Sequence, residues 1–592
     1  LYPYLLYTEL LGELRYSKRV EITAYLKSYQ GTVKAQFLQG KWLDYLARRG
    51  HWQSYSDVYG KYAYIPNTSR QCNFHLAQYR LGNKPAALQA GLKRWSQGKS
   101  QPKTCDKLFG ILISGGHISE RLAWWRFNEA MLSRRYQLAR YLERFFVSPS
   151  YKKRYAIYYQ VHRDPRRISQ HSNFVDHSED ELNILEHGLK NLARKDPNRA
   201  LKHWSRYQQT HEFSHRARAN VVSEIVKALY DAGNTSAADS YFVDHLKLLN
   251  QTLQGSLTEW RIREALRELD WPAVRKWLAR LPKENQQESI WRYWTIRSME
   301  GDPASTLNPH IETLTQRLAQ ERDFYGFLAS EKLALEYSLN NTPVPIDEVR
   351  INQLAAMPSM QRARELLFHN DSLNANREWY SATQGFTNPD WLAAAVLANQ
   401  WQWHNKAIAS LGRVKYWDDV EIRFPLAYVE LINRAAQDTG IPSYMLFALV
   451  RQESAFNASA TSSAGAMGLI QVMPATAKST ARKYKIPYRN KKQLHTPATN
   501  ISIGSKYYMS MLERFDNNRI LATAAYNAGP HRVDQWLKKS SGKLPFDIWM
   551  TLIPFKETRG YVSSVLMYST IYSRKLGLDT PMLLQHEREV LL

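Results

Sequence analysis

The 592-residue sequence has only two cysteines, and it has no apolar run that approaches the length of a membrane helix. A transmembrane candidate needs about 18 consecutive apolar residues, so a membrane-spanning chain is not predicted. The two cysteines, at positions 72 and 105, do not have the short spacing of cysteines that bind zinc. We therefore expect neither a metal ion nor another cofactor.

The sequence also has few acidic residues for its size. Lys and Arg outnumber Asp and Glu by 80 to 54, a formal net charge of +26. This excess predicts a polyanionic partner: nucleic acid, an acidic membrane face or an anionic cell-wall polymer. No initiator Met or signal-like segment opens the sequence at Leu1, so we expect a mature or trimmed product.

The two cysteines, Cys72 and Cys105, leave two interpretations open. Two buried thiols and a disulfide are both compatible with their spacing. A disulfide would close a loop of about 34 residues and stabilise the fold by roughly 3–4 kcal/mol. Such a bond would fit an exported protein.

Strand-like alternation is nearly absent, and helical periodicity dominates the first 340 residues. Residues 217–232 and 259–281 carry apolar side chains at spacings of three and four. The pattern predicts an all-α fold in which short helical hairpins stack into a superhelix. The tryptophans of this region, Trp124, Trp125, Trp291 and Trp294, are expected in helix packing rather than as platforms for sugars or bases.

Two breaks divide the chain. Residues 340–345 contain two prolines that stop a helix, and the periodicity breaks again around residues 418–425. We therefore predict three parts, at residues 1–343, 344–421 and 422–592.

A carboxylate stands on the apolar face of one predicted helix. A helix is expected from Tyr444, and its apolar stripe through Leu446, Leu449 and Val450 continues to Glu453. Burial raises the pKa of a carboxyl group, which suits a general acid near neutral pH. A buried glutamate that is only structural is the alternative.

The residues after this helix could form a ligand site. Residues 459–468 are a run of small side chains that lets backbone approach a ligand closely. Gln471 and Met473 follow, offering an amide and an adaptable apolar contact. Residues 524–530 then end one helix and open another, which leaves a phenol and an amide near the break.

Three of these strings, in this order, resemble the motifs of the soluble lytic transglycosylases, lysozyme-like enzymes of bacterial cell-wall turnover. They are Glu453-Ser454, Gly468-Leu469-Ile470-Gln471 and Ala525-Tyr526-Asn527. The usual Met at the third position of the second motif is replaced by Ile470, a change that conserves volume. The resemblance continues in residues 553–562, 421–426, 72 and 105–109, and so covers essentially the whole chain.

The resemblance implies a fold, a location and a site. The fold would be a helical superhelix (1–343) closed into a ring by a helical linker domain (344–421), with a lysozyme-like catalytic domain (422–592) on it. The chain would be a periplasmic monomer, exported with its signal peptide removed and carrying a Cys72–Cys105 disulfide. Glu453 would be the catalytic acid and base, and the substrate-binding residues would be Ser454, Ser462, Gln471, Met473, Tyr526, Asn527 and Glu557, the last at the peptide stem.

The implied substrate is peptidoglycan, as glycan strands and muropeptides. Most glycosidases use two carboxylates, yet no Asp or Glu occurs between Ser454 and Leu512, where eight Lys or Arg stand. A single carboxylate favours non-hydrolytic cleavage, in which the muramic C6 hydroxyl closes a 1,6-anhydro ring. The basic residues from Lys478 to Lys492 are expected either to bind the anionic polymer or to be a solvated face.

Other functions remain open. A hydrolytic muramidase would need a second carboxylate from Glu513, Asp516 or Asp534. A helical scaffold that binds nucleic acid would fit the charge, but no nucleic-acid motif is present, and we expect no nucleic-acid partner. Proteins of cell-wall synthesis or division are further candidate partners.

Overall fold

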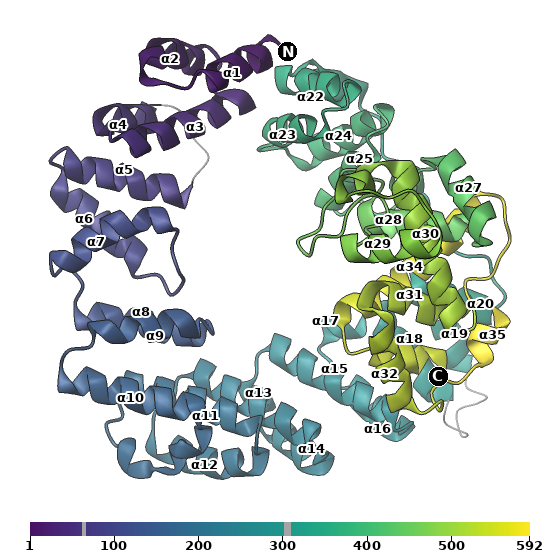
Figure 1. Ribbon diagram of the computed structural model, residues 1–592. Helices are drawn as coiled ribbons and strands as arrows, with labels where there is room; N and C mark the ends of the chain where they lie inside the picture. The colour runs from purple at the N-terminus through teal and green to yellow at the C-terminus, as the bar shows by residue number, and fades with distance from the viewer. Residues whose placement is uncertain (62–66, 301–308) are drawn as a thin grey trace. The chain divides into compact units, whose positions relative to one another are not determined.

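The computed structural model describes residues 1–61, 67–300 and 309–592, and throughout these residues helix follows helix (Figure 1). The only β pairing in this described part consists of isolated bridges that join Met467 to Thr461 and to Val472. The predicted all-α fold is therefore confirmed. No helix among the described residues has both the length and the apolar character that crossing a membrane requires.

The described chain divides into two compact units, Leu1–Leu253 with Leu373–Ser381 and Gln254–Ser372 with Ala382–Leu592. Helices α15 (Gln251–Arg267) and α23 (Ser372–Ala382) cross the borders of these units. The three predicted domains and their closure into a ring stay predictions.

The first unit is a succession of short helices, and neighbours in the chain pack as hairpins in α3–α4, α5–α6, α8–α9 and α11–α12 (Figure 1). Side chains of Thr32, Asn67, Ser119 and Ser214 accept hydrogen bonds from backbone N–H groups and so fix where four of the helices begin. The helices are α1 (Tyr2–Gly12), α2 (Arg19–Ser28), α3 (Val33–Arg49), α4 (Trp52–Lys61), α5 (Thr68–Arg80), α6 (Lys84–Trp95), α7 (Asp106–Ser114), α8 (Glu120–Leu132), α9 (Tyr136–Leu142), α10 (Pro149–Arg163), α11 (Glu179–Ala193), α12 (Pro197–Thr210), α13 (His215–Asp231) and α14 (Thr235–Asp244).

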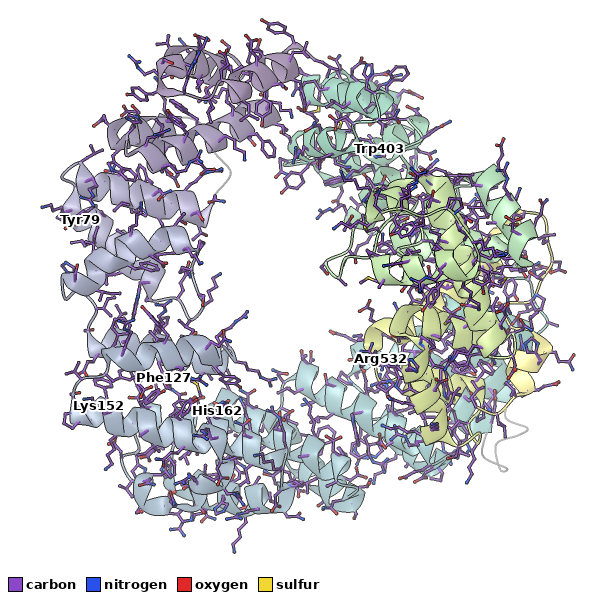
Figure 2. The ribbon with its side chains drawn as sticks, viewed as in Figure 1. Tyr79, Phe127, Lys152, His162, Trp403 and Arg532 are labelled. Atoms are coloured by element: carbon purple, nitrogen blue, oxygen red, sulfur yellow. A yellow bond between two sulfur atoms is a disulfide. The ribbon has the colours of Figure 1, made fainter. Side chains whose placement is uncertain are left out.

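Aromatic side chains fill the space between these helices. Phe127 on α8, labelled in Figure 2, is fully buried, and its ring meets Tyr155 and Tyr158 of α10. Trp124 lies beside it and is buried as predicted, whereas Trp125 is half exposed. Aromatic packing between helices therefore accounts for the first of the two Trp pairs only in part.

The two cysteines form a disulfide. Cys72 on α5 is bonded to Cys105, at the end of a short 3₁₀ helix (Lys103–Cys105) that leads into α7. Both residues are buried. The bond implied by the resemblance is confirmed, and the alternative of two free thiols is wrong.

Residues from the middle of the chain complete the first unit. Tyr4 of α1 donates its hydroxyl to Oε1 of Glu378 at 2.6 Å, and Nζ of Lys34 donates to Oδ1 of Asn374 at 3.2 Å. The carboxyl of Glu378 is fully buried. A stretch of the predicted linker domain thus packs against the first helices of the chain.

The second unit contains the remaining helices. They are α16 (Trp271–Leu278), α17 (Lys283–Gln286), α18 (Ser289–Glu300), α19 (Pro309–Ala319), α20 (Phe324–Lys332), α21 (Glu348–Ala356), α22 (Pro358–Phe368), α24 (Asn388–Gln400), α25 (His404–Arg413), α26 (Val420–Arg423), α27 (Val429–Thr439), α28 (Ser443–Ser454), α29 (Pro474–Lys483), α30 (Pro497–Arg514), α31 (Arg519–Ala528), α32 (Pro530–Ser540), α33 (Phe546–Leu552), α34 (Lys556–Lys575) and α35 (Gln585–Glu589). Trp291 and Trp294 of α18 are buried, as predicted.

The first predicted break in this unit is present, since no helix lies between α20 and α21, where the two prolines stand. The second, around residues 418–425, contains the four-residue helix α26 (Val420–Arg423). The periodic segment 259–281 is divided between α15 and α16, because Leu269 takes a left-handed φ of 56° and Asp270 caps α16. The hydrophobic periodicity continues across this turn, so the sequence alone predicts residues 259–281 as one helical segment.

Buried ion pairs tie the helices of the second unit together. The carboxylate of Glu587 on α35 accepts hydrogen bonds from Nε and Nη2 of Arg519, at the start of α31, and from the backbone N–H groups of Arg519 and Leu584. Likewise, the buried Asp547 of α33 accepts from Tyr293 and Arg297 of α18. Charged groups at such depth are retained only when they are paired.

Candidate active site

Glu453 lies in the last turn of α28, as predicted. Leu446, Leu449 and Val450, which precede it on the same face, are fully buried. The helix packs along α34 (Figure 1), and from there the hydroxyl of Tyr561 donates a hydrogen bond to Oε1 of Glu453 at 2.6 Å. The carboxyl group is therefore held by a helix face on one side and by a phenol on the other.

The protonation of Glu453 is set by this environment. Burial raises its pKa from 4.5 to about 7, against the hydrogen bond from Tyr561, which lowers it, and the charge of Glu557 raises it further. Desolvation is the largest of the three effects. A carboxyl group with such a pKa can both donate and accept a proton near neutral pH.

The turn after Glu453 is strained. Ala455 and Phe456 both take left-handed conformations, with φ of 49° and 66°. Such a conformation costs a non-glycine residue roughly 1–2 kcal/mol and persists where the surroundings enforce it. The ring of Phe456 is buried and meets the imidazole of His404, the first residue of α25, edge to face at 6.3 Å. This packing holds the turn that follows the carboxylate.

The small-residue run forms a tight loop. The backbone of Met467 pairs with that of Val472, and Asn500 of α30 accepts from the N–H of Ile470 and donates to the carbonyl of Met467, both at 2.8 Å. Gly468 has a φ of 82°, and a Cβ there would lie 2.0 Å from the carbonyl oxygen of Leu494. Only glycine fits this position.

Helix α30 also comes very close to the loop. A Cβ on Gly504 would lie 2.1 Å from Cγ2 of Ile470, whose side chain is fully buried. The branched side chain of Ile470, which replaces the family's Met, therefore occupies the space that a side chain at residue 504 would need.

The third motif meets the first two. The hydroxyl of Tyr526 on α31 donates to the carbonyl of Ile470 at 2.7 Å. Burial, and next the charge of Glu453, raise the pKa of Tyr526. The phenol of Tyr526 therefore lies close enough to the carboxylate of Glu453 for the two groups to interact electrostatically. Asn527 accepts from the hydroxyl of Thr558 at 2.7 Å, which ties α31 to the first turn of α34.

The other predicted site residues lie in the same region but make local contacts. The Ser454 hydroxyl accepts from the N–H of Asn457, and the Ser462 hydroxyl accepts from the N–H of Ala466. The amide of Gln471 donates to the carbonyl of Gly468 at 2.7 Å. Met473 and Glu557 are exposed, Met473 before α29 and Glu557 in the first turn of α34.

Two residues of the site escaped the sequence-based assignment. Tyr561 lies within the string 553–562, four residues after Glu557, and this spacing puts both on one side of α34. Helical periodicity could therefore have identified Tyr561 as a neighbour of Glu557. Asn500 has no such signal, because only folding brings it to the loop.

The acidic residues predicted to serve a two-carboxylate mechanism are not among the groups that shift the pKa of Glu453. Glu513 is exposed and lies 4.0 Å from Lys483, and Asp534 pairs with Arg514 at 2.6 Å. Asp516 is exposed. The charge that perturbs Glu453 comes instead from Glu557.

One string has the letters of a zinc motif, His-Glu-x-x-His, at residues 211–215, and this counts against the sequence-based expectation of no metal. The motif needs both histidines on one helix face. Here Ser214 caps α13, so His211 precedes the helix, and its Nε2 lies 2.8 Å from Oε1 of Glu181. Within residues 1–61, 67–300 and 309–592, no group of three His, Cys, Asp or Glu side chains could hold a metal ion.

Three family models match this chain. The transglycosylase SLT domain matches residues 430–548, and the L domain of soluble lytic murein transglycosylases matches residues 353–420. The helical domain of soluble lytic transglycosylases matches residues 552–580, which include α34.

Whole-length relatives share the sequence and the fold. The chain is 31% identical to the soluble lytic murein transglycosylase of Salmonella typhimurium, over 98% of this chain and 88% of the relative. Its structure resembles that of the 70 kDa soluble lytic transglycosylase of Escherichia coli, with a TM-score of 0.86, 29% identity and coverage of 100% and 94% of the two chains. It also resembles an inactive Glu-to-Gln variant of the lytic transglycosylase Slt from Pseudomonas aeruginosa, with a TM-score of 0.77, 36% identity and coverage of 99% and 94%.

Proposed function

This chain belongs to the soluble lytic murein transglycosylase family, and we propose that Glu453 alone performs both proton transfers of the family's reaction in this protein. The protein is a lytic murein transglycosylase that acts on peptidoglycan. The observation that carries the assignment is the desolvated carboxyl of Glu453, with a pKa of about 7, among all three motifs.

The chemistry follows from one carboxyl group used twice. Glu453 first donates its proton to the glycosidic oxygen between N-acetylmuramic acid and N-acetylglucosamine as the C1–O bond breaks. The acetamido oxygen of the muramic sugar stabilises the positive charge at C1. Ionised Glu453 then takes the proton of the C6 hydroxyl, and O6 bonds to C1. The 1,6-anhydro ring closes without consuming water.

Several features support a single carboxylate. Asp534 pairs with Arg514, and neither Asp534 nor Glu513 is among the charges that shift the pKa of Glu453. The Pseudomonas relative is inactive as a Glu-to-Gln variant, so one glutamate is essential in that protein. Tyr561 would stabilise the ionised form of Glu453 between the two transfers, because its hydroxyl donates to the carboxylate.

The remaining site residues would position the sugars. Tyr526 and Asn527 hold the loop and α34 near the carboxylate, while Ser454, Ser462, Gln471 and Met473 would line the glycan. The exposed Glu557 would meet the peptide stem, in a catalytic domain of residues 422–592 preceded by superhelix (1–343) and linker (344–421) domains.

The site of action would be the periplasm. The Cys72–Cys105 disulfide fits an oxidising compartment, and peptidoglycan is the substrate that an exported monomer would meet there. Proteins of cell-wall synthesis or division are candidate partners.

The product tests the mechanism. Digestion of purified sacculi should yield muropeptides whose new muramic ends are anhydro sugars, lighter by one water than reducing ends, as mass analysis will show. Reducing-end muropeptides as the main product would contradict the mechanism. They would favour a muramidase with a second carboxylate.

Replacing the phenol tests the role of Tyr561. In Tyr561→Phe the hydrogen bond that lowers the pKa of Glu453 is lost, so this pKa should rise above about 7. The limb of the pH profile of kcat/KM that reports ionisation of Glu453 should move to higher pH. Its maximum should fall about tenfold, as expected for one bond to a charged group. Tyr568→Phe, two turns further along α34, is the control, and an unmoved profile in Tyr561→Phe would refute this role.

A further inference from the structure

A large cavity lies away from Glu453, between α16, α17, α18 and α19. Its volume is about 670 Å³, which is within the range of sites for small ligands. Apolar side chains from three of these helices form much of the wall, among them Leu278, Ile296, Met299 and Leu314. The cavity lies within the second unit, in the part of the chain assigned to the superhelix.

Among the described residues that line this cavity, the charged ones are Arg275, Arg292 and Arg317. Arg275 donates a hydrogen bond from Nη1 to the carbonyl of Ser298 at 2.7 Å. Arg292 is neutralised in part by Glu321, at 2.6 Å. Arg317 is exposed and has no ion-pair partner in the described part of the chain. An anionic ligand is therefore favoured at the arginine side.

The polar part of the lining is largely engaged. Trp291 lines the cavity, but the N–H of its indole is buried away from the cavity surface and cannot meet a ligand there. The amide of Gln286 donates to the backbone carbonyls of Ala279 and Leu281. This leaves the amide of Gln287, an exposed residue of the lining, to meet a ligand.

We propose that this cavity, the α16–α19 cavity, binds the free peptide stems of peptidoglycan. The inference rests on the proposed function, because it takes its ligand from the same polymer. A stem is a short peptide with small aliphatic side chains and free carboxylates. Its methyl groups match the apolar wall, its carboxylates the arginines, above all the exposed Arg317, and its backbone carbonyls the amide of Gln287. The cavity is thus a second contact for the substrate, apart from the site of cleavage.

The binding test uses the full-length Glu453→Gln protein and a synthetic tetrapeptide stem without sugar. Calorimetry should show about tenfold weaker binding for Arg317→Glu, which reverses the charge at the exposed arginine. Ala279→Phe, which fills the cavity from the exposed end of α16 and leaves every arginine in place, should have a similar effect. Lys283→Glu is the matched control, because this exposed residue of α17 makes the same charge change outside the lining.

The ligand is tested by its chemistry. A tetrapeptide with every carboxylate amidated should bind at least tenfold more weakly than the free acid. Equal binding of the tetrapeptide to both cavity variants and to the control would overturn the proposal. So would binding of decanoate, a plain fatty carboxylate, without binding of the tetrapeptide.

The two proposals fail separately. Anhydro ends from wild-type protein report only on Glu453, whereas tetrapeptide binding to the Glu453→Gln protein needs no turnover. With wild-type Glu453, Arg317→Glu should digest sacculi more slowly than Lys283→Glu but form the same anhydro ends.

Discussion

Replacing Glu453 with glutamine should abolish nearly all cleavage of peptidoglycan while the protein stays folded. The amide has the shape of the carboxyl group, but it cannot give a proton to the glycosidic oxygen and cannot take one from the C6 hydroxyl. Loss of general acid–base catalysis alone is worth about 10²–10⁴-fold, and here one group performs both steps. Release of soluble muropeptides from sacculi measures the effect.

The same variant should become relatively more stable as the pH rises. The pKa of Glu453 is raised by burial from 4.5 to about 7. Between these values the unfolded chain gives up the proton first, so the stability of the wild type falls with rising pH. Glutamine removes this loss, which amounts to about 3 kcal/mol because each pKa unit corresponds to about 1.4 kcal/mol. Thermal unfolding at pH 5 and pH 8 measures the difference.

Glu513→Gln is the control, because this glutamate is exposed and its nearest cation is 4.0 Å away. It should change neither turnover nor the pH dependence of stability. A folded Glu453→Gln protein with a substantial share of wild-type activity would move the catalytic role to another residue.

The second large effect is expected on stability. Glu587→Ala removes the acceptor of four hydrogen bonds and leaves the guanidinium of Arg519 buried without its partner. Breaking a buried ion pair from one side costs about 3–5 kcal/mol. Since Arg519 begins the helix that carries Tyr526, the site should be weakened as well. Denaturant unfolding of the full chain should show the loss.

Glu589→Ala provides the comparison for this change. Glu589 ends the same short helix α35 but is exposed, and its contact is a hydrogen bond from Gln585. It should cost less than about 1 kcal/mol, as most surface substitutions do. Equal stability of the two variants would mean that the buried pair adds little to the fold.

The sequence was sufficient for the elements whose information is local. The stripe that leads to Glu453, the start of α29 at Pro474 and the break at Gly529 can all be read from periodicity and turn residues. Motif order then placed Tyr526 near the carboxylate.

The remainder depends on contacts between distant parts of the chain. Asn500 joins the loop only because α30 packs beside it, and His404 meets Phe456 across fifty residues. The turn at Leu269 was missed because only hydrophobic spacing was used there, although Asp270 and Pro272 mark the start of α16. Tyr561, by contrast, lies within residues 553–562, which resemble the family, but only its hydrogen bond to Glu453 reveals its role.

The contact between Ile470 and Gly504 has an evolutionary consequence. The two positions share one space, since a methyl group on residue 504 would overlap the branch of Ile470. A change at one position therefore alters which residues selection accepts at the other. An unbranched residue at 470 would remove the nearest of these contacts, at 2.1 Å, while Cγ2 of Val472 would still lie 3.2 Å from the added methyl group. The two sites should evolve as a pair.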